Sequence, residues 1–239
     1  MSRIAAEAGE VDGKGQITPI SMGDWENRLE AYLLYGEPSQ KCLVAEGEAG
    51  CGKSEITVQA CRRIVGAEPI VVPGMGAQQQ EELLSAVKLI EGPDGEGKLL
   101  QGVIDSLIPT EKLAKDPAYN QHGKTIIPWI IDEIWTGNGA QMNQIRAALT
   151  FRRIGGVQLP NGVYVIGTTN PEDVAYSSRK SVDAAVMDRV ETYRVFLKFD
   201  EHQKYLSQLE SEGRYPEVCR MFLRMDENCL LYTSDAADE

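Results

Sequence analysis

Short apolar runs alternate with helix-like stretches along most of the chain. Five runs have the length and the apolar composition of buried strands. They are Cys42–Glu46, 68–72, 126–131, 163–166 and 191–197. Strands that alternate with helices form a parallel sheet that is covered by helices on both faces. The pattern therefore predicts an α/β domain.

Helical spacing of apolar residues is clearest in residues 24–35, where Asp24 is the predicted N-cap. The apolar positions of this helix are Trp25, Leu29, Tyr32 and Leu33. Further helices are predicted over 55–65, 78–90, 142–150 and 181–188. Residues 98–107 are apolar enough for either a helix or a strand. Residues 109–124 are typical of a polar loop, and 155–162 of a turn-rich hairpin.

The charge balance narrows the classes of partner. The chain has 239 residues, enough for one domain of moderate size, with 36 acidic and 24 basic residues and a net charge of −12. This balance argues against broad binding to nucleic acid or to acidic membranes, although it leaves room for a local basic pore loop. No apolar run approaches the length needed to cross a bilayer, and residues 1–15 are too polar for a secretory signal.

The five cysteines are scattered at positions 42, 51, 61, 219 and 229, and none forms a C-x-x-C pair. This spacing is typical of reduced thiols rather than of a disulfide framework or a zinc site. We therefore expect a cytoplasmic protein.

The two ends of the chain differ from the middle. Residues 1–18 show little apolar periodicity, and we expect a flexible arm. Residues 229–239 resemble one reading frame of a transposase sequencing adapter, and we expect them to be non-native. On that interpretation the chain is a gene fragment that stops near Asn228. The alternative is an ordinary acidic tail.

A glycine-rich segment between the first predicted strand and the following helix fits G-x-x-x-x-G-K-[ST], the phosphate-binding P-loop. Its residues are Gly47, Glu48, Ala49, Gly50, Cys51, Gly52, Lys53 and Ser54. The glycines allow a tight turn whose N–H groups cradle a polyphosphate at the N-terminus of the helix. Lys53 would reach the β- and γ-phosphates, and Ser54 would offer its hydroxyl to Mg²⁺. The alternative is a glycine-rich turn that is followed by Lys-Ser by chance.

Two adjacent carboxylates, Asp132 and Glu133, follow the apolar run 126–131. Ligands of open α/β folds bind at the carboxyl ends of the strands. Asp132 would hold the Mg²⁺ shell through water, and Glu133 would polarise the water that attacks the γ-phosphate. The alternative is a solvated strand end, but the P-loop upstream favours the catalytic interpretation.

Asn170 ends the fourth predicted strand, where it would orient the attacking water or contact the γ-phosphate. Thr168 and Thr169 are the nearby alternatives for this role. Asn170-Pro171 is also a turn signal, which is compatible with both roles.

Arg189 lies just before the fifth predicted strand, where it would act in a neighbouring subunit's site as an arginine finger. The alternative is an exposed arginine at a helix end. Arg152 and Arg153 are more typical of an interface or pore-side pair than of a catalytic one. His122 and His202 have no partner at metal-ligand spacing, and we expect both on the surface.

The order of these motifs resembles that of the AAA+ ATPases, and more closely their MoxR-like and dynein-related branch. The resemblance covers roughly residues 43–195. It rests on the P-loop, 130–134, 144–149, 165–171 and 188–190. Carried over residue by residue, Lys53 and Ser54 would be the Walker A pair and Asp132 and Glu133 the Walker B pair. Asn170 would be sensor 1, and Arg189 the arginine finger.

The family implies a P-loop NTPase fold with three αβα layers and a five-stranded parallel sheet in the order 5-1-4-3-2. It also implies a ring, usually hexameric, that binds ATP and Mg²⁺ between subunits and remodels a protein client. Relatives often work beside a von Willebrand factor A partner. On this model, residues 19–200 form the nucleotide-binding domain and 201–228 the start of a truncated helical lid.

The chain departs from the family in two places. Residues 135–138 (Trp-Thr-Gly-Asn) replace the usual Asn-Arg, and Val190 replaces the usual Phe. Arg214 and Arg220 belong to no motif that would mark a second sensor.

Two other functions remain open at this point. One is a nucleic-acid-directed P-loop motor of a restriction or phage system, which the acidic balance disfavours. The other is a non-catalytic subunit that binds nucleotide only as a structural ligand, which the two carboxylates disfavour. The motifs do not separate ATP from GTP.

Overall fold

The computed structural model describes residues 17–39, 41–72, 108–135, 139–154, 157–171, 186, 188–211 and 213. The predicted helices over 78–90 and 181–188, the stretch 98–107 and the adapter-like tail lie outside these residues, apart from Val186 and Asp188.

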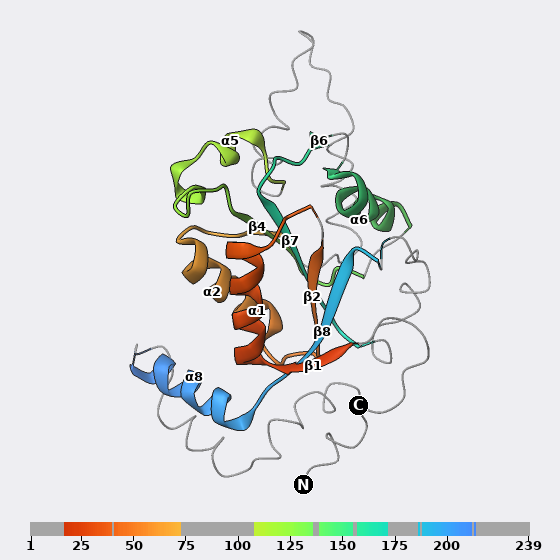
Figure 1. Cartoon of the computed structure of the whole chain (residues 1–239). Helices are drawn as coiled ribbons and strands as arrows, with labels where there is room; N and C mark the ends of the chain where they lie inside the picture. The colour runs from red at the N-terminus through yellow and green to blue at the C-terminus, as the bar shows by residue number, and fades with distance from the viewer. Residues whose placement is uncertain are drawn as a thin grey trace, which may run out of the picture.

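A six-stranded parallel sheet forms the centre of the domain (Figure 1). Its strands, from one edge to the other, are β1 (Thr18–Ser21), β8 (Val190–Phe196), β2 (Cys42–Glu46), β7 (Val163–Thr169), β4 (Ile127–Ile131) and β3 (Ile70–Val72). The five predicted strands have the predicted order 5-1-4-3-2, and the α/β fold class is confirmed.

The sixth strand corrects the predicted count of five. β1 pairs with β8 in parallel, with Thr18 opposite Tyr193. It begins at Thr18, the last residue of the stretch that we expected to be a flexible arm. β1 is a short edge strand with two exposed residues and a proline, so it has no apolar run to mark it.

Four longer helices accompany the sheet. They are α1 (Met22–Tyr35), α2 (Lys53–Val65), α6 (Gly139–Phe151) and α8 (Phe199–Ser211). Figure 1 shows α1 and α2 together on one side of the sheet and α6 on the other, which gives the three predicted layers. α8 contacts the side of the sheet that carries α1 and α2. Glu201 of α8 accepts a hydrogen bond from the Gly23 N–H of α1 at 3.4 Å, and Tyr205 Oη of α8 accepts one from the Gln59 side chain of α2 at 3.3 Å.

Helix α1 begins two residues before the predicted start, so its N-cap is Ser21 and not Asp24. The Ser21 Oγ accepts from the Asp24 N–H at 3.2 Å. Asp24 lies in the first turn instead, where a negative charge complements the helix dipole.

The predicted polar loop 109–124 contains two short helical turns, α5 (Glu111–Ala114) and η2 (Pro117–Tyr119). The turn-rich hairpin predicted over 155–162 begins two residues earlier, since its antiparallel pair is β5 (Arg153–Ile154) and β6 (Val157–Gln158).

The core lies between the sheet and its helices. Every residue of β2, β4 and β7 is buried. Trp25 and Leu29 of α1 are fully buried against this sheet side. Because these three adjacent strands are parallel, their carboxyl ends meet at one edge, where the predicted site residues follow them. Among the described residues, every helix is too short or too polar to span a bilayer.

Candidate functional site

The glycine-rich loop between β2 and α2 has the backbone of a tight turn. Gly50 and Gly52 have positive φ values of 74° and 90°. These are left-handed conformations that favour glycine. Gly47 is required for another reason, because a Cβ there would lie 2.6 Å from the Val195 carbonyl oxygen. The loop geometry therefore explains all three glycines.

The first turn of α2 faces this loop without a side-chain cap, because its N-cap is Gly52. The leading N–H groups of a helix have no acceptor within the helix. Together with the helix dipole, they form a site for an anion.

Lys53 brings a charge to the same place. Its side chain is buried, and its Nζ donates to the Glu48 carbonyl at 2.8 Å and to Asn170 Oδ1 at 3.0 Å. The ammonium group therefore lies between the loop and the end of β7. Two predicted site residues, Lys53 and Asn170, are in direct contact.

Ser54 and Asp132 also come together. Ser54 Oγ donates to Asp132 Oδ1 at 2.7 Å, and the Thr168 hydroxyl donates to the same oxygen. A hydroxyl and a carboxylate are the oxygen ligands that Mg²⁺ takes from proteins, with phosphate and water completing its shell. In the described part of the chain, no cluster of three or more His, Cys, Asp or Glu residues is arranged to hold a metal. The Ser54 hydroxyl and the Asp132 carboxylate, which lie in direct contact, fit Mg²⁺ that is bound together with a polyphosphate.

Glu133 lies beside these groups in an uncommon backbone conformation, with φ of 48°. Its Oε1 accepts from Asn170 Nδ2 at 2.9 Å, and its N–H donates to Thr168 Oγ1 at 3.4 Å. Burial raises the pKa of Glu133, and Asp132 raises it further, while Lys53 and Asn170 act in the opposite direction. A carboxylate with a raised pKa is suited to accept a proton.

The strand register explains why these residues meet. Glu46 pairs with Thr169 across β2 and β7, and Ile131 pairs with Gly167 across β4 and β7. β2 and β7 therefore end at the same level, β4 ends two residues before it, and the segments that follow the three strands leave the sheet at one edge. The Gly47 N–H donates to the Thr169 carbonyl at 3.2 Å, which joins the loop to the end of β7.

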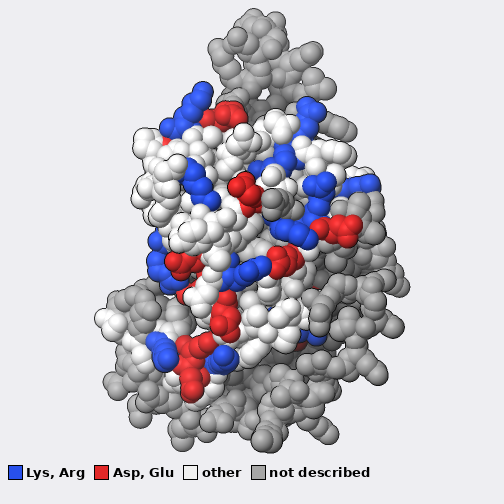
Figure 2. All heavy atoms as spheres, viewed as in Figure 1, with Lys and Arg blue, Asp and Glu red and all other residues white. Residues whose placement is uncertain are grey.

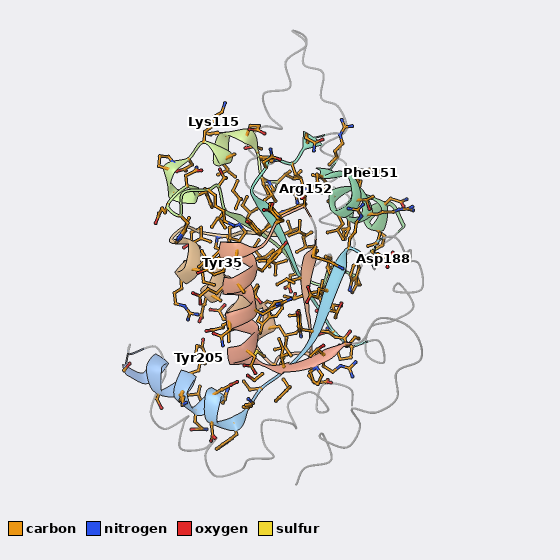
Figure 3. The ribbon with its side chains drawn as sticks, viewed as in Figure 1. Tyr35, Lys115, Phe151, Arg152, Asp188 and Tyr205 are labelled. Carbon is orange, nitrogen blue, oxygen red and sulfur yellow. The ribbon has the colours of Figure 1, made fainter. Side chains whose placement is uncertain are left out.

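Arg189 is not part of this cluster. It precedes β8, and its carbonyl accepts from the Cys42 N–H at 2.8 Å, at the start of β2. The loop follows the other end of β2, where Glu46 pairs with Arg194. Figure 3 labels the neighbouring Asp188 at this start of β8. Within one chain, Arg189 therefore lies at the edge of the sheet opposite to the loop.

An ion pair that no sequence motif predicted lies beside the loop. The Glu46 side chain is fully buried, and its Oε1 accepts from Arg194 Nη2 at 2.7 Å and from Nε at 3.1 Å. Glu46 directly precedes Gly47, so the pair fixes β8 to the base of the loop. The one sequence signal for this ion pair is the position of Glu46 in an apolar strand, because a buried carboxylate requires a partner.

Cys51 and Arg152 also have surroundings that the sequence did not predict. Cys51 is half-buried within the loop, and burial raises the pKa of its thiol. Arg152, labelled in Figure 3 after α6, donates to the carbonyls of Pro38 (3.1 Å) and Val163 (2.8 Å). Its guanidinium thus bonds backbone carbonyls of its own chain, and its role at an interface or pore stays a prediction.

Of the other residues singled out, Arg153 and His122 are exposed. His202 is half-buried in α8 rather than on the open surface, and burial lowers its pKa.

Several solved structures are distantly similar to this chain. No protein-family model matches the chain, and a search of curated proteins finds no match. The Aeropyrum pernix ORC2 protein, solved in ADPNP–ADP complexes, has a TM-score of 0.44 at 15% identity over 77% of this chain and 50% of that chain. A chain of the E. coli MS115-1 HORMA:CdnC:Trip13 complex has a TM-score of 0.38 at 16% identity, over 78% of this chain and 58% of that chain.

The Pif1 helicase from Candida albicans has a TM-score of 0.34 at 16% identity over 83% of this chain and 46% of that chain. The chain thus spans about half the length of these solved proteins. At this distance they carry no argument about function, which rests on the site itself.

Proposed function

We propose that this chain is a P-loop ATPase of the AAA+ type, which binds ATP with Mg²⁺ and hydrolyses its γ-phosphate bond. The supporting observation is that five side chains from three segments of the sequence meet beside one glycine-rich loop. These are Lys53, Ser54, Asp132, Glu133 and Asn170. A phosphate-binding loop alone would support nucleotide binding; the carboxylate pair beside it supports hydrolysis.

Each side chain has a role that follows from its position. Lys53 places its ammonium over the loop, where it binds the β- and γ-phosphates and offsets negative charge as the bond breaks. Ser54 and Asp132 would hold Mg²⁺, which supplies charge neutralisation on the phosphate oxygens when bound.

Glu133 accepts a hydrogen bond from the attacking water and orients it, with Asn170 fixing the Glu133 carboxylate. Water attack on the γ-phosphorus forms the new P–O bond while the bond to the β-phosphate oxygen breaks. ADP and inorganic phosphate are the products.

We further propose a ring assembly of the MoxR-like kind, with a hexamer as its usual form. Within its own chain Arg189 lies at the edge of the sheet opposite to the loop, so its proposed role as an arginine finger requires a neighbouring subunit. A protein client and a von Willebrand factor A partner belong to the same proposal. They rest on the resemblance of the motifs.

The test compares wild type with Glu133→Gln and Lys53→Ala for both binding and turnover. We expect Glu133→Gln to keep nucleotide binding and lose about 10²–10⁴-fold of turnover, since it removes the base alone. Lys53→Ala should lose binding. Glu37→Gln, an exposed glutamate in the loop after α1, is the matched control.

Phosphate release from ATP and from GTP, with Mg²⁺ and with EDTA, is the measurement. Wild-type protein that binds neither nucleotide, or a Glu133→Gln variant that hydrolyses at the wild-type rate, would contradict the proposal.

A further inference from the structure

Thr168, the second-last residue of β7, has contacts that its neighbours do not share. Its side chain is fully buried. Its hydroxyl donates to Asp132 Oδ1 and accepts from the Glu133 N–H at 3.4 Å. Its carbonyl accepts from the Ile134 N–H at 2.9 Å. One residue of β7 therefore contacts three consecutive residues that follow β4.

These contacts act on both carboxylate residues at once. A hydroxyl group has one donor and two acceptor sites, so the same oxygen can serve Asp132 and Glu133 together. Of the two hydroxyls that donate to Asp132, Ser54 is itself a proposed Mg²⁺ ligand, whereas Thr168 is not. The hydrogen bond from Thr168 therefore serves to orient the Asp132 carboxylate.

The backbone of Glu133 also depends on this contact. Its φ of 48° lies in the left-handed region, which residues other than glycine rarely adopt. Such a conformation persists where surrounding bonds fix it. The Thr168 hydroxyl and carbonyl bond the backbone on each side of the Glu133 Cα, through Glu133 N and Ile134 N.

We propose that Thr168 is a positioning residue for both carboxylates, which orients Asp132 toward the metal and Glu133 toward the water. The inference rests on the proposed function and adds a residue to it. Thr168 contacts neither substrate nor metal in this assignment, so it acts only through Asp132 and Glu133.

Burial alone does not explain these contacts, because the adjacent Thr169 is equally buried. The Thr169 hydroxyl donates to the Asn170 carbonyl at 3.3 Å and contacts neither carboxylate. Successive side chains of a strand point to opposite faces, so only one of the two threonines can face Asp132. Thr169→Val therefore removes the same chemical group from the same strand without touching the carboxylates.

The experiment compares Thr168→Val, Thr168→Ser and Thr169→Val in the full chain. The readouts are the Mg²⁺ concentration for half-maximal ATP hydrolysis, kcat at saturating Mg²⁺, and the affinity for a fluorescent ATP analogue with Mg²⁺ and in EDTA. The metal-free affinity is the readout that does not depend on turnover.

We expect Thr168→Val to raise the half-saturating Mg²⁺ concentration about tenfold, because a hydrogen bond to a charged group is lost. Its kcat should fall as well, while the affinity in EDTA should stay within about twofold of wild type, since Lys53 and the loop are unchanged. Thr168→Ser keeps the hydroxyl and should restore most of both parameters. Thr169→Val should leave the half-saturating Mg²⁺ concentration within about twofold of wild type.

The inference is overturned if Thr168→Val has the wild-type Mg²⁺ dependence and kcat, or if Thr168→Val and Thr169→Val shift them equally. If Thr168→Val does not fold, Thr168→Ser and Thr168→Ala decide, and equal losses in both would exclude a role for the hydroxyl. A wild-type protein that binds no nucleotide would instead overturn the proposed function and the inference with it.

Discussion

The groups around Glu133 change the pKa of its carboxylate. Burial disfavours its charged form, and the Asp132 carboxylate beside it adds repulsion. Lys53 and Asn170 offset part of this effect. The result is a raised pKa at a position where a proton acceptor is required.

The raised pKa predicts both the pH profile and the stability of a variant. Turnover should fall as the pH drops through the folded-state pKa of Glu133, which burial raises from its ordinary value. Because that pKa is higher than in the unfolded chain, the ionised side chain costs stability, and the cost grows as the pH rises from the unfolded to the folded value. Glu133→Gln should therefore unfold at or above the wild-type temperature at neutral pH.

Calorimetry at neutral pH and at a pH below the unfolded-state pKa measures this difference. A Glu133→Gln variant that is clearly less stable than wild type at neutral pH would show that the carboxylate stabilises the fold instead.

The residue types of the site were predictable from the sequence, but several of their partners were not. The P-loop and Asp132-Glu133 can be recognised from local sequence patterns alone. Glu46 and Arg194 lie far apart in the sequence, and no local pattern connects them. The same holds for Thr168, whose contacts with the Asp132 carboxylate and with the Glu133 and Ile134 N–H groups depend on the register of β4 and β7.

At the scale of elements, α1 and α2 are joined by a buried polar chain. Trp25 Nε1 donates to Thr57 Oγ1 at 2.9 Å, and this hydroxyl donates to the Lys53 carbonyl at 2.7 Å. Both side chains are fully buried. Helix α1 is thereby tied to the first turn of the helix that carries Lys53.

Thr57→Val should destabilise the fold by about 1–3 kcal/mol, because it leaves the buried Trp25 N–H without its acceptor. Trp25→Phe is the partner variant, and the double variant should cost less than the sum of the two single changes. Urea unfolding of the four proteins completes the cycle. A double variant whose cost equals that sum would show that the hydrogen bond carries no coupling energy.

Elements with strong apolar patterns were predicted most reliably. β2 has its predicted bounds, because all five of its residues are buried and it lies between the exposed Lys41 and Gly47, the first glycine of the loop. β1 had no such pattern and joined the sheet only through β8. The start of α1 was wrong by two residues because Ser21 and Asp24 are both good capping residues, and the strand before the helix decided between them.

At the scale of the whole molecule, the two edges of the sheet carry different groups. The P-loop and the carboxylates lie at the carboxyl edge, and Arg189 lies at the amino edge. Figure 2 shows acidic and basic side chains interspersed on the face in view. The net charge of the whole chain is −12, which does not favour broad nucleic-acid binding.

Because Arg189 is proposed to act in the site of a neighbouring subunit, we expect two inactive variants to restore activity when they are mixed. Arg189→Ala should keep ATP binding and lose about 10³-fold or more of turnover. Mixed with Lys53→Ala, it should regain activity, because a Lys53→Ala subunit still offers Arg189 to a neighbour with an intact loop. Arg62→Ala, which removes an exposed ion pair with Glu68, is the control. Mixed assemblies that stay inactive would place Arg189 outside the site.

The strand order also has a consequence for synthesis of the chain. β2, which delivers the P-loop, pairs only with β7 and β8, and both are made long after it. The carbonyls of Thr169 and Val195, which bound the loop at Gly47, come from these late strands. When the glycine-rich segment leaves the ribosome, the two strands whose carbonyls contact it have therefore not yet emerged. Pairings this distant in sequence form slowly, so the backbone around the loop is complete only after residue 196 has emerged.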